Sequence, residues 1–299
     1  MKQICVIIYL LLCQQIWAQG SYDDLMAAMI AAKIHQDSID VSSIVIVYNY
    51  TCQTRDAEDK PVTDRMKVAL QIGSHCTRSY PYRKYCEDTE DMDYLTPENF
   101  PILRAETYCF MPEVWTNYPD GKITVRDVIF PNHYETCESR KPISWTLGDE
   151  TVTVGDYICK TATCELHGQQ WLVRYTEEIP SAAGPWKLCG LPGLILNAET
   201  TDGIHRFTVE SVSRTASPIY YEHNAITAKI SNKKLIKNRI KIFGNKRYPK
   251  NPQYYIPNRS DLNSTADVTF LQFGDDFFSI VNGILENKDA HVYQPLELK

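Results

Sequence analysis

Cysteines, a histidine and two adjacent acids are the side chains of this chain whose types and spacing could do chemistry. One set has a spacing loosely like that of zinc ligands: Cys159, Cys164, His167 and Cys189. The adjacent acids Glu177 and Glu178 would point to opposite faces of a strand, so they cannot share a proton as a catalytic pair. The sequence contains no HExxH, GxSxG, GxGxxG or P-loop motif. We therefore predict no catalytic residue and no cofactor.

The first twenty residues predict export. A short basic start is followed by an apolar run from Ile4 to Leu12, which is too short to span a bilayer, and then by the small residue Ala18. We predict a signal peptide over residues 1–18 that is cleaved near Ala18, with lipid attachment at Cys13 as the alternative. No later segment has eighteen consecutive apolar residues, so we predict no membrane span. The expected location is the periplasm, the outer membrane or the exterior of the cell.

Cysteine usage agrees with export. Eight cysteines follow the predicted signal peptide: Cys52, Cys76, Cys86, Cys109, Cys137, Cys159, Cys164 and Cys189. An even number of cysteines in an exported chain predicts up to four disulfides without fixing their pairing. We favour disulfides over a metal site, because thiolates outside the cytoplasm tend to oxidise. The cysteines end at residue 189, which suggests a disulfide-containing domain over 19–225 and a distinct portion over 226–299.

The composition excludes several classes of protein. The chain has 299 residues, of which 43% are hydrophobic and 23% charged, so it is neither disordered nor a multi-span membrane protein. Its formal net charge of −6 provides no general basic field for a phosphate backbone. We therefore exclude nucleic acid as a partner.

Short runs of β-branched and aromatic residues predict a mostly β protein. The predicted strands are 43–50, 66–72, 123–130, 143–147, 151–154, 157–165, 170–176, 194–198 and 204–212. Turn signals separate them: Asp120-Gly121, Gly148-Asp149, His167-Gly168 and Asp202-Gly203. Helical segments are too few to act as crossovers, and the first of them is expected at 21–34. The fold class is therefore mainly β (α+β): a curved antiparallel sheet or half-barrel meander with a few covering helices.

The C-terminal portion is basic. Residues 228–250 carry nine lysines and arginines and no acid. Their apolar positions fit one helical face: Leu235, Ile236, Ile240 and Phe243. We favour a solvated helix that packs this face on the sheet over a helix that contacts an anionic surface. A last short helix is predicted at 276–288.

A segment rich in glycine and proline is the most specific part of the sequence. It contains Gly184, Pro185, Trp186, Lys187, Leu188 and Cys189, followed by Gly190, Leu191, Pro192, Gly193, Leu194 and Ile195. Upstream, Trp145, the strand at 155–162 and the turn and strand at 167–171 complete the pattern. On these residues the chain resembles the GLPGLI family of exported proteins from Bacteroidetes-type (Porphyromonas-type) bacteria. The resemblance implies an exported envelope protein and no particular reaction.

The motif itself has two interpretations. The structural one is a rigid corner in which Pro192 and Gly193 form a type II turn, with Gly193 at positive φ and Trp186 as a plug in the core. The functional one is a rim where Trp186, Lys187, Glu177 and Glu178 hold a ligand.

Two hypotheses about function follow. The first is a non-enzymatic binding or structural protein whose concave β surface takes an apolar ligand, a peptide or an outer-membrane protein. The alternative is an envelope hydrolase whose catalytic residues are dispersed along the chain. We favour the first, since no catalytic constellation is found.

Overall fold

The computed structural model describes residues 35–56, 58–90, 111–129, 132–223, 227–243, 268–273, 276–281, 284–287 and 292–299. The predicted signal peptide, the helix expected at 21–34 and Cys109 lie outside these ranges. The chain divides into a small unit, Met1–Asp37 with Tyr221–Ala225, and a large unit, Ser38–Tyr220 with Ile226–Lys299. The site described below lies wholly within the large unit.

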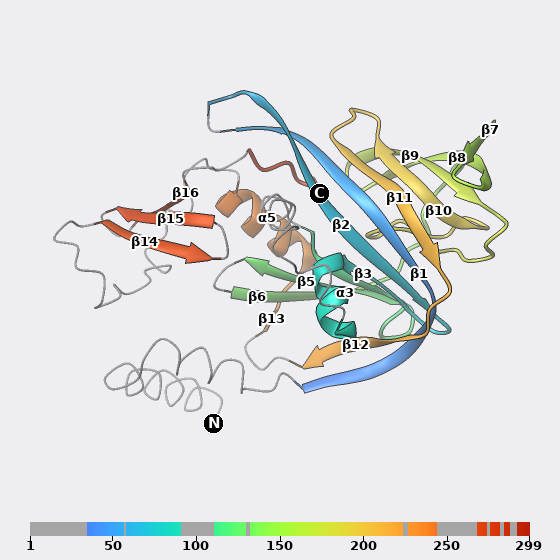
Figure 1. Ribbon diagram of the computed structural model, residues 1–299, viewed down its shortest axis with the longest axis horizontal. Coiled ribbons are helices and arrows are strands. Elements are labelled where there is room, and N and C mark those ends of the chain that lie inside the picture. Colours follow the sequence, from blue (N-terminus) through green and yellow to red (C-terminus); the bar gives the residue numbers. More distant parts are fainter. Residues whose placement is uncertain are drawn as a thin grey trace. The chain divides into compact units, whose positions relative to one another are not determined.

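Two antiparallel meanders form one large sheet (Figure 1). The first meander consists of β1 (His35–Arg55), β2 (Pro61–Gly73), β3 (Thr77–Pro81), β4 (Glu113–Thr116), β5 (Lys122–Ile129) and β6 (Asn132–Ser139). The second consists of β7 (Thr146–Val154), β8 (Tyr157–Leu166), β9 (Gln169–Thr176), β10 (Leu194–Thr200) and β11 (His205–Ser213). Strands β1 and β11 pair antiparallel and join the meanders. This is the predicted class, a large antiparallel sheet, and its strand order does not close on itself.

Short elements extend the sheet and lie around it. Strand β12 (Ser217–His223) pairs with β1, and β13 (Ala228–Lys229) adds to β6 in parallel. The described helices are α3 (Tyr82–Thr89) and α5 (Asn232–Phe243). Neither is long and apolar enough to cross a membrane.

The hairpin signals at His167-Gly168 and Asp202-Gly203 are confirmed, since they join β8 to β9 and β10 to β11. His167 and Gly168 both have positive φ, 51° and 86°, as a type I′ turn requires.

The turn predicted at Gly148-Asp149 is wrong. Residues 146–154 form one strand, β7, whose register against β8 shifts between Leu147 and Thr151. An ideal Cβ on Gly148 would lie 2.3 Å from the Thr161 hydroxyl oxygen, so glycine permits a bulge at this close approach.

The C-terminal portion is only partly as predicted. Helix α5 lies within the predicted 228–250 and buries Leu235 and Ile236, whereas Ile240 is 45% exposed. The helix predicted at 276–288 is wrong, because β15 (Asp276–Val281) and β16 (Ile284–Asn287) form a three-stranded sheet with β14 (Val268–Phe273). Aromatic and β-branched residues dominate β15, and the sequence between the paired residues Val281 and Ile284 is Asn-Gly, the strongest short hairpin signal.

The buried face of the second meander is aromatic. Trp171 packs against Trp186 and Phe207 at ring-centroid distances of 5.7 and 6.2 Å. The Tyr48 hydroxyl on β1 donates a hydrogen bond of 2.6 Å to the carbonyl of Ile195 on β10. The junction between the meanders is therefore fixed by side chains as well as by the β1–β11 ladder.

Candidate functional site

The four residues that the sequence placed on one rim differ in burial. Trp186 is 1% exposed and packs on Trp171, as expected of a core plug, and Lys187 is also buried. Glu177 and Glu178 are exposed. Glu177 pairs with Lys160 at 2.9 Å, and a Glu178 carboxylate oxygen accepts the backbone N–H of Ile158 at 2.9 Å. Two of the four side chains are therefore in the interior and two at the surface.

The glycines of the motif act differently from the prediction. Gly193 is not among the residues with positive φ, so the predicted type II turn is wrong. The left-handed residues of the segment are Gly190, with φ 97°, and Trp186, with φ 55°. Gly193 is needed for close approach instead, because an ideal Cβ there would lie 2.1 Å from the Thr176 carbonyl oxygen. The same holds for Gly184, whose ideal Cβ would lie 2.7 Å from the Leu188 carbonyl oxygen.

Buried leucines and isoleucines anchor the corner. Pro185, Leu191, Leu194 and Ile195 are buried, whereas Pro192 is exposed. The Trp145 indole N–H donates to the Cys189 carbonyl at 3.0 Å and ties the corner to the chain before β7. The GLPGLI corner is therefore packed against β9 from one side and carries Lys187 on its preceding segment.

Lys187 belongs to a site that the sequence did not predict, formed around residues 292–299, here called the C-terminal segment. This segment has no regular secondary structure. Its first residue, Val292, donates its N–H to the Arg55 carbonyl at 2.7 Å, and its carbonyl accepts a hydrogen bond from the Thr54 hydroxyl. The end of β1 therefore holds the start of the C-terminal segment through main-chain groups.

The middle of the C-terminal segment lies over the second meander. The Pro295 carbonyl accepts a hydrogen bond of 3.2 Å from the Gln169 side-chain amide and lies 3.3 Å from Nε2 of His205. Leu296 is 3% exposed and belongs to the main hydrophobic core. Leu298 donates its N–H to the His167 carbonyl at 2.9 Å, while its own side chain is 50% exposed.

Glu297 is the charged anchor of the segment. Its Oε1 lies 2.6 Å from Nζ of Lys187, and its Oε2 accepts a hydrogen bond of 2.9 Å from the Asn232 side-chain amide at the start of α5. Burial favours the neutral acid, but the charge of Lys187 and the hydrogen bonds outweigh it, so the pKa of Glu297 lies below its ordinary value. The side chains that receive the C-terminal segment, here called the seat, are Thr54, His167, Gln169, Lys187, His205 and Asn232.

His205 is a neutral member of the seat. Burial lowers its pKa to about 4, so the ring is uncharged at neutral pH. Its Nε2 faces the Pro295 carbonyl and must carry the proton, so its Nδ1 accepts the hydrogen bond of 2.8 Å from the Tyr50 hydroxyl. Both ring nitrogens are therefore engaged.

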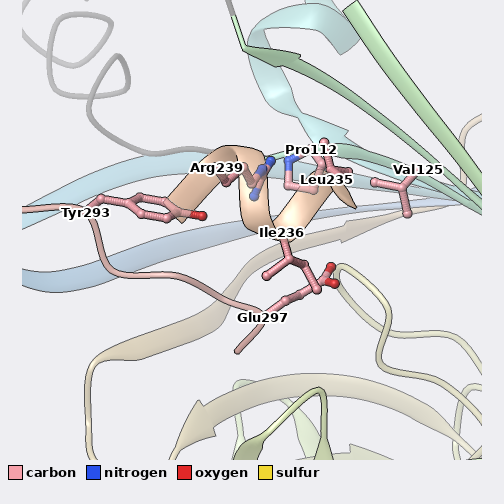
Figure 2. A pocket seen from close by; sticks show the side chains of 7 residues that line it. All are labelled: Pro112, Val125, Leu235, Ile236, Arg239, Tyr293 and Glu297. Atoms are coloured by element: carbon pink, nitrogen blue, oxygen red, sulfur yellow. The ribbon is translucent and has the colours of Figure 1, made fainter. Parts of the chain in front are cut away.

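A small cavity lies beside the seat (Figure 2). Its volume is about 10 Å³, room for about one water molecule. Its lining comes from the residue before β4, from β5, from α5 and from the C-terminal segment: Pro112, Val125, Leu235, Ile236, Arg239, Tyr293 and Glu297. Arg239 forms a buried ion pair with Asp127, which ties α5 to β5 next to the cavity.

The cysteines and metal-ligand types do not form a centre in the described part of the chain. There, no group of three or more His, Cys, Asp and Glu residues is placed to hold a metal ion. No disulfide joins any two of the seven cysteines that are described. The seat combines main-chain partners, an apolar site and a buried ammonium, and residues 292–299 engage all three.

Among known proteins, the chain matches solved structures but no family model and no curated protein. No family model matches the chain, and neither does a curated protein. Among solved structures the chain is similar to PNGF-II in two crystal forms, with TM-scores of 0.43 and 0.42 and 14% sequence identity in each case. The matches cover 80% and 79% of this chain but 40% of each PNGF-II chain, so the chain spans less than half the length of that protein. A likeness at this level assigns no function.

Proposed function

We propose that the chain is an exported cell-envelope protein of the GLPGLI family, and that it binds a short polypeptide segment in the seat. The observation that carries the proposal is the way the seat holds its own residues 292–299. Main-chain groups of Val292, Pro295 and Leu298 are all hydrogen-bonded or faced by donors and acceptors of the sheet. Main-chain contacts of this kind can form with peptides of many sequences. The buried side chain of Leu296 and the buried charge of Glu297 are what distinguish one sequence from another.

The resident segment would compete with any partner. A segment linked to its own seat binds intramolecularly, so a partner binds only when the resident segment is released or out-competed. This makes exchange the measurable property: weakening the resident segment should expose the seat to a peptide added in solution.

The test uses the full-length mature chain and a fluorescent peptide with the sequence of residues 292–299. The variant Leu296→Ala removes most of a side chain that is 3% exposed, which weakens a buried apolar contact by about 2–5 kcal/mol. We expect this variant to bind the peptide at least tenfold more tightly than the unchanged chain, measured by fluorescence anisotropy.

Leu298→Ala is the matched control, since it makes the same chemical change in the same segment at a side chain that is 50% exposed. It should leave peptide binding as it is in the unchanged chain. Absence of peptide binding by both the unchanged chain and Leu296→Ala would contradict the proposal.

The proposal includes export to the periplasm or beyond, with removal of residues 1–18 and oxidation of cysteines. The basis is the sequence pattern of the first twenty residues and the even number of cysteines after them. The intact mass of the protein from its native envelope tests this directly. A chain that begins at Gln19 is expected, and a chain that retains Met1 would contradict it.

A further inference from the structure

We infer that Lys187 makes the seat selective for a segment in which a glutamate directly follows a buried apolar residue. This inference rests on the proposed function and names the class of peptide that the seat takes. In the structure the pair is Leu296 and Glu297, and the ammonium of Lys187 lies 2.6 Å from the Glu297 carboxylate. The two charged side chains are 4% and 10% exposed, respectively.

The Lys187–Glu297 contact can select among peptides because both charges are buried. An ammonium or a carboxylate removed from water is costly unless it has a charged or hydrogen-bonding partner. A peptide with a neutral side chain at the Glu297 position would leave Lys187 buried without its counter-ion. Such a peptide lacks the favourable contact with Lys187 and also leaves the buried ammonium without a partner. The resulting difference in binding free energy is the source of specificity.

The backbone holds Lys187 in place. Trp186 has φ 55°, a left-handed conformation that is unfavourable for a bulky residue and persists only where the surroundings impose it. The surroundings here are the packing of its indole on Trp171 and the hydrogen bond of 2.8 Å from the Trp186 N–H to the buried Ser79 hydroxyl. The segment before the GLPGLI motif thus anchors the residue that precedes the ammonium.

The side-chain amide of Asn232 is a second donor, and it determines which acidic side chain has the right length. Asn232 donates to the carboxylate oxygen that is not the one nearest Lys187. The two donors come from different elements, the motif segment and α5, so the carboxylate must reach a fixed point between them. Leu296, buried in the core, fixes the register of the segment relative to that point. Glutamate is therefore preferred over glutamine, which lacks the charge, and over the shorter aspartate.

The experiment compares peptides on the full-length Leu296→Ala chain, whose seat is available. The peptides have the sequence of residues 292–299 with glutamate, glutamine or lysine at the sixth position. We expect the glutamine peptide to bind about tenfold to a hundredfold more weakly than the glutamate peptide, and the lysine peptide more weakly still. Equal binding of the glutamate and glutamine peptides would overturn the inference while leaving the proposed function standing.

Two further variants assign the selection to Lys187. Lys187→Met in the same background should remove the preference for glutamate over glutamine, because an apolar side chain of similar length needs no counter-ion. Lys187→Glu should reverse the order and favour the lysine peptide. Lys160→Met, a change at an exposed lysine, should leave the preference unchanged.

Near-ultraviolet circular dichroism of the buried tryptophans verifies that each variant is folded. Glutamate selectivity that persists in folded Lys187→Met would overturn the assignment. If the Leu296→Ala chain binds none of the three peptides, the proposed function and the inference both fail.

Discussion

Gly193 is the residue of the GLPGLI corner with the least room for change. An ideal Cβ there would lie 2.1 Å from the carbonyl oxygen and 2.6 Å from the carbonyl carbon of Thr176, and both atoms belong to the backbone. We expect Gly193→Ala to lower the free energy of unfolding by about 3 kcal/mol, measured by urea denaturation, because the backbone must shift to admit the methyl group.

Gly203→Ala is the comparison for this prediction. Gly203 has φ 74° with open space around its Cβ position, so alanine there meets only the left-handed strain of about 1–2 kcal/mol. A smaller loss in Gly193→Ala than in Gly203→Ala would show that steric approach is not what requires glycine in the motif.

His205 gives the protein a pH-dependent stability. Its pKa is about 4 in the folded protein, against 6.5 ordinarily, so only the unfolded chain takes up a proton between these values. The contribution of His205 to the free energy of unfolding is present in full above pH 6.5. It decreases as the pH falls from 6.5 and is lost as the pH passes through 4. It amounts to about 3 kcal/mol. Urea denaturation at pH 7 and at pH 4.5 should show the greater part of this difference.

His205→Gln should reduce that pH dependence, since glutamine can still accept from Tyr50 and donate to Pro295 without titrating. The matched control is His75→Gln, the same change at an exposed histidine, which should leave the pH dependence as it is in the unchanged chain. Full pH dependence in His205→Gln would show that His205 is not its source.

At the residue scale, the sequence could predict local roles but not partners. Trp186 was expected in the core because glycines and prolines around it predict a rigid corner. The functional interpretation placed Lys187 on a rim, where an aromatic face and paired charges could hold a ligand. Its counter-ion, Glu297, is 110 residues further along, and no spacing rule brings the two together. The seat is therefore a product of topology, which a search for local motifs does not detect.

At the scale of elements, prediction succeeded where one face of a strand is apolar and failed where charges are buried. β8 to β11 show β-branched and aromatic residues in short runs, and all four were predicted. β3 and β4 were not, because Arg78 is fully buried and pairs with Asp88 and Glu113 at 2.6 and 2.7 Å. β6 was missed for the same reason, since Glu135 is buried against Arg126 at 2.9 Å. Buried ion pairs weaken the hydrophobic signal on which strand prediction depends, although β5, which carries the buried Arg126, was predicted from its β-branched run.

We predict one disulfide, between Cys164 on β8 and Cys189 in the motif segment. Burial, and next the electrostatic influence of Cys189, raise the pKa of Cys164 to about 12, so Cys164 is a neutral thiol at neutral pH. In an oxidising compartment we expect the two thiols to give up two electrons and two protons to a disulfide oxidant and form the Cys164–Cys189 bond.

Peptide mapping by mass spectrometry without reductant would detect this link. Cys137, which is exposed on β6, serves as the internal comparison and should not be linked to either residue. Recovery of Cys164 and Cys189 on unlinked peptides from oxidised protein would contradict the prediction.

At the scale of the whole molecule, the C-terminal portion and the large sheet belong together. The sequence predicted a distinct portion over 226–299 that packs on the β domain, and residues 226–299 fall in the same compact unit as the sheet. Arg239 pairs with Asp127 on β5, and Glu297 pairs with Lys187 beside β10. The C-terminal portion is thus joined to the rest of the chain by two buried ion pairs, one from the basic run and one from the C-terminal segment.

The β1–β11 ladder should make the two meanders unfold together. β1 pairs with β2 on one side and with β11 on the other, so neither meander keeps all its hydrogen bonds if this strand is lost. We expect Trp115 on β4 and Trp171 on β9 to report the same unfolding midpoint in urea. The measurement is fluorine NMR of protein labelled with fluorotryptophan.

Tyr48→Phe tests the coupling, because it removes the hydroxyl that donates to Ile195 across this junction. The loss of a buried hydrogen bond should lower the free energy of unfolding by about 1–2 kcal/mol and move both midpoints equally. Tyr157→Phe, at a half-buried side chain on β8, should move neither. A variant in which only the Trp171 midpoint shifts would mean that the meanders unfold separately, with the junction acting as an interface between two independent halves.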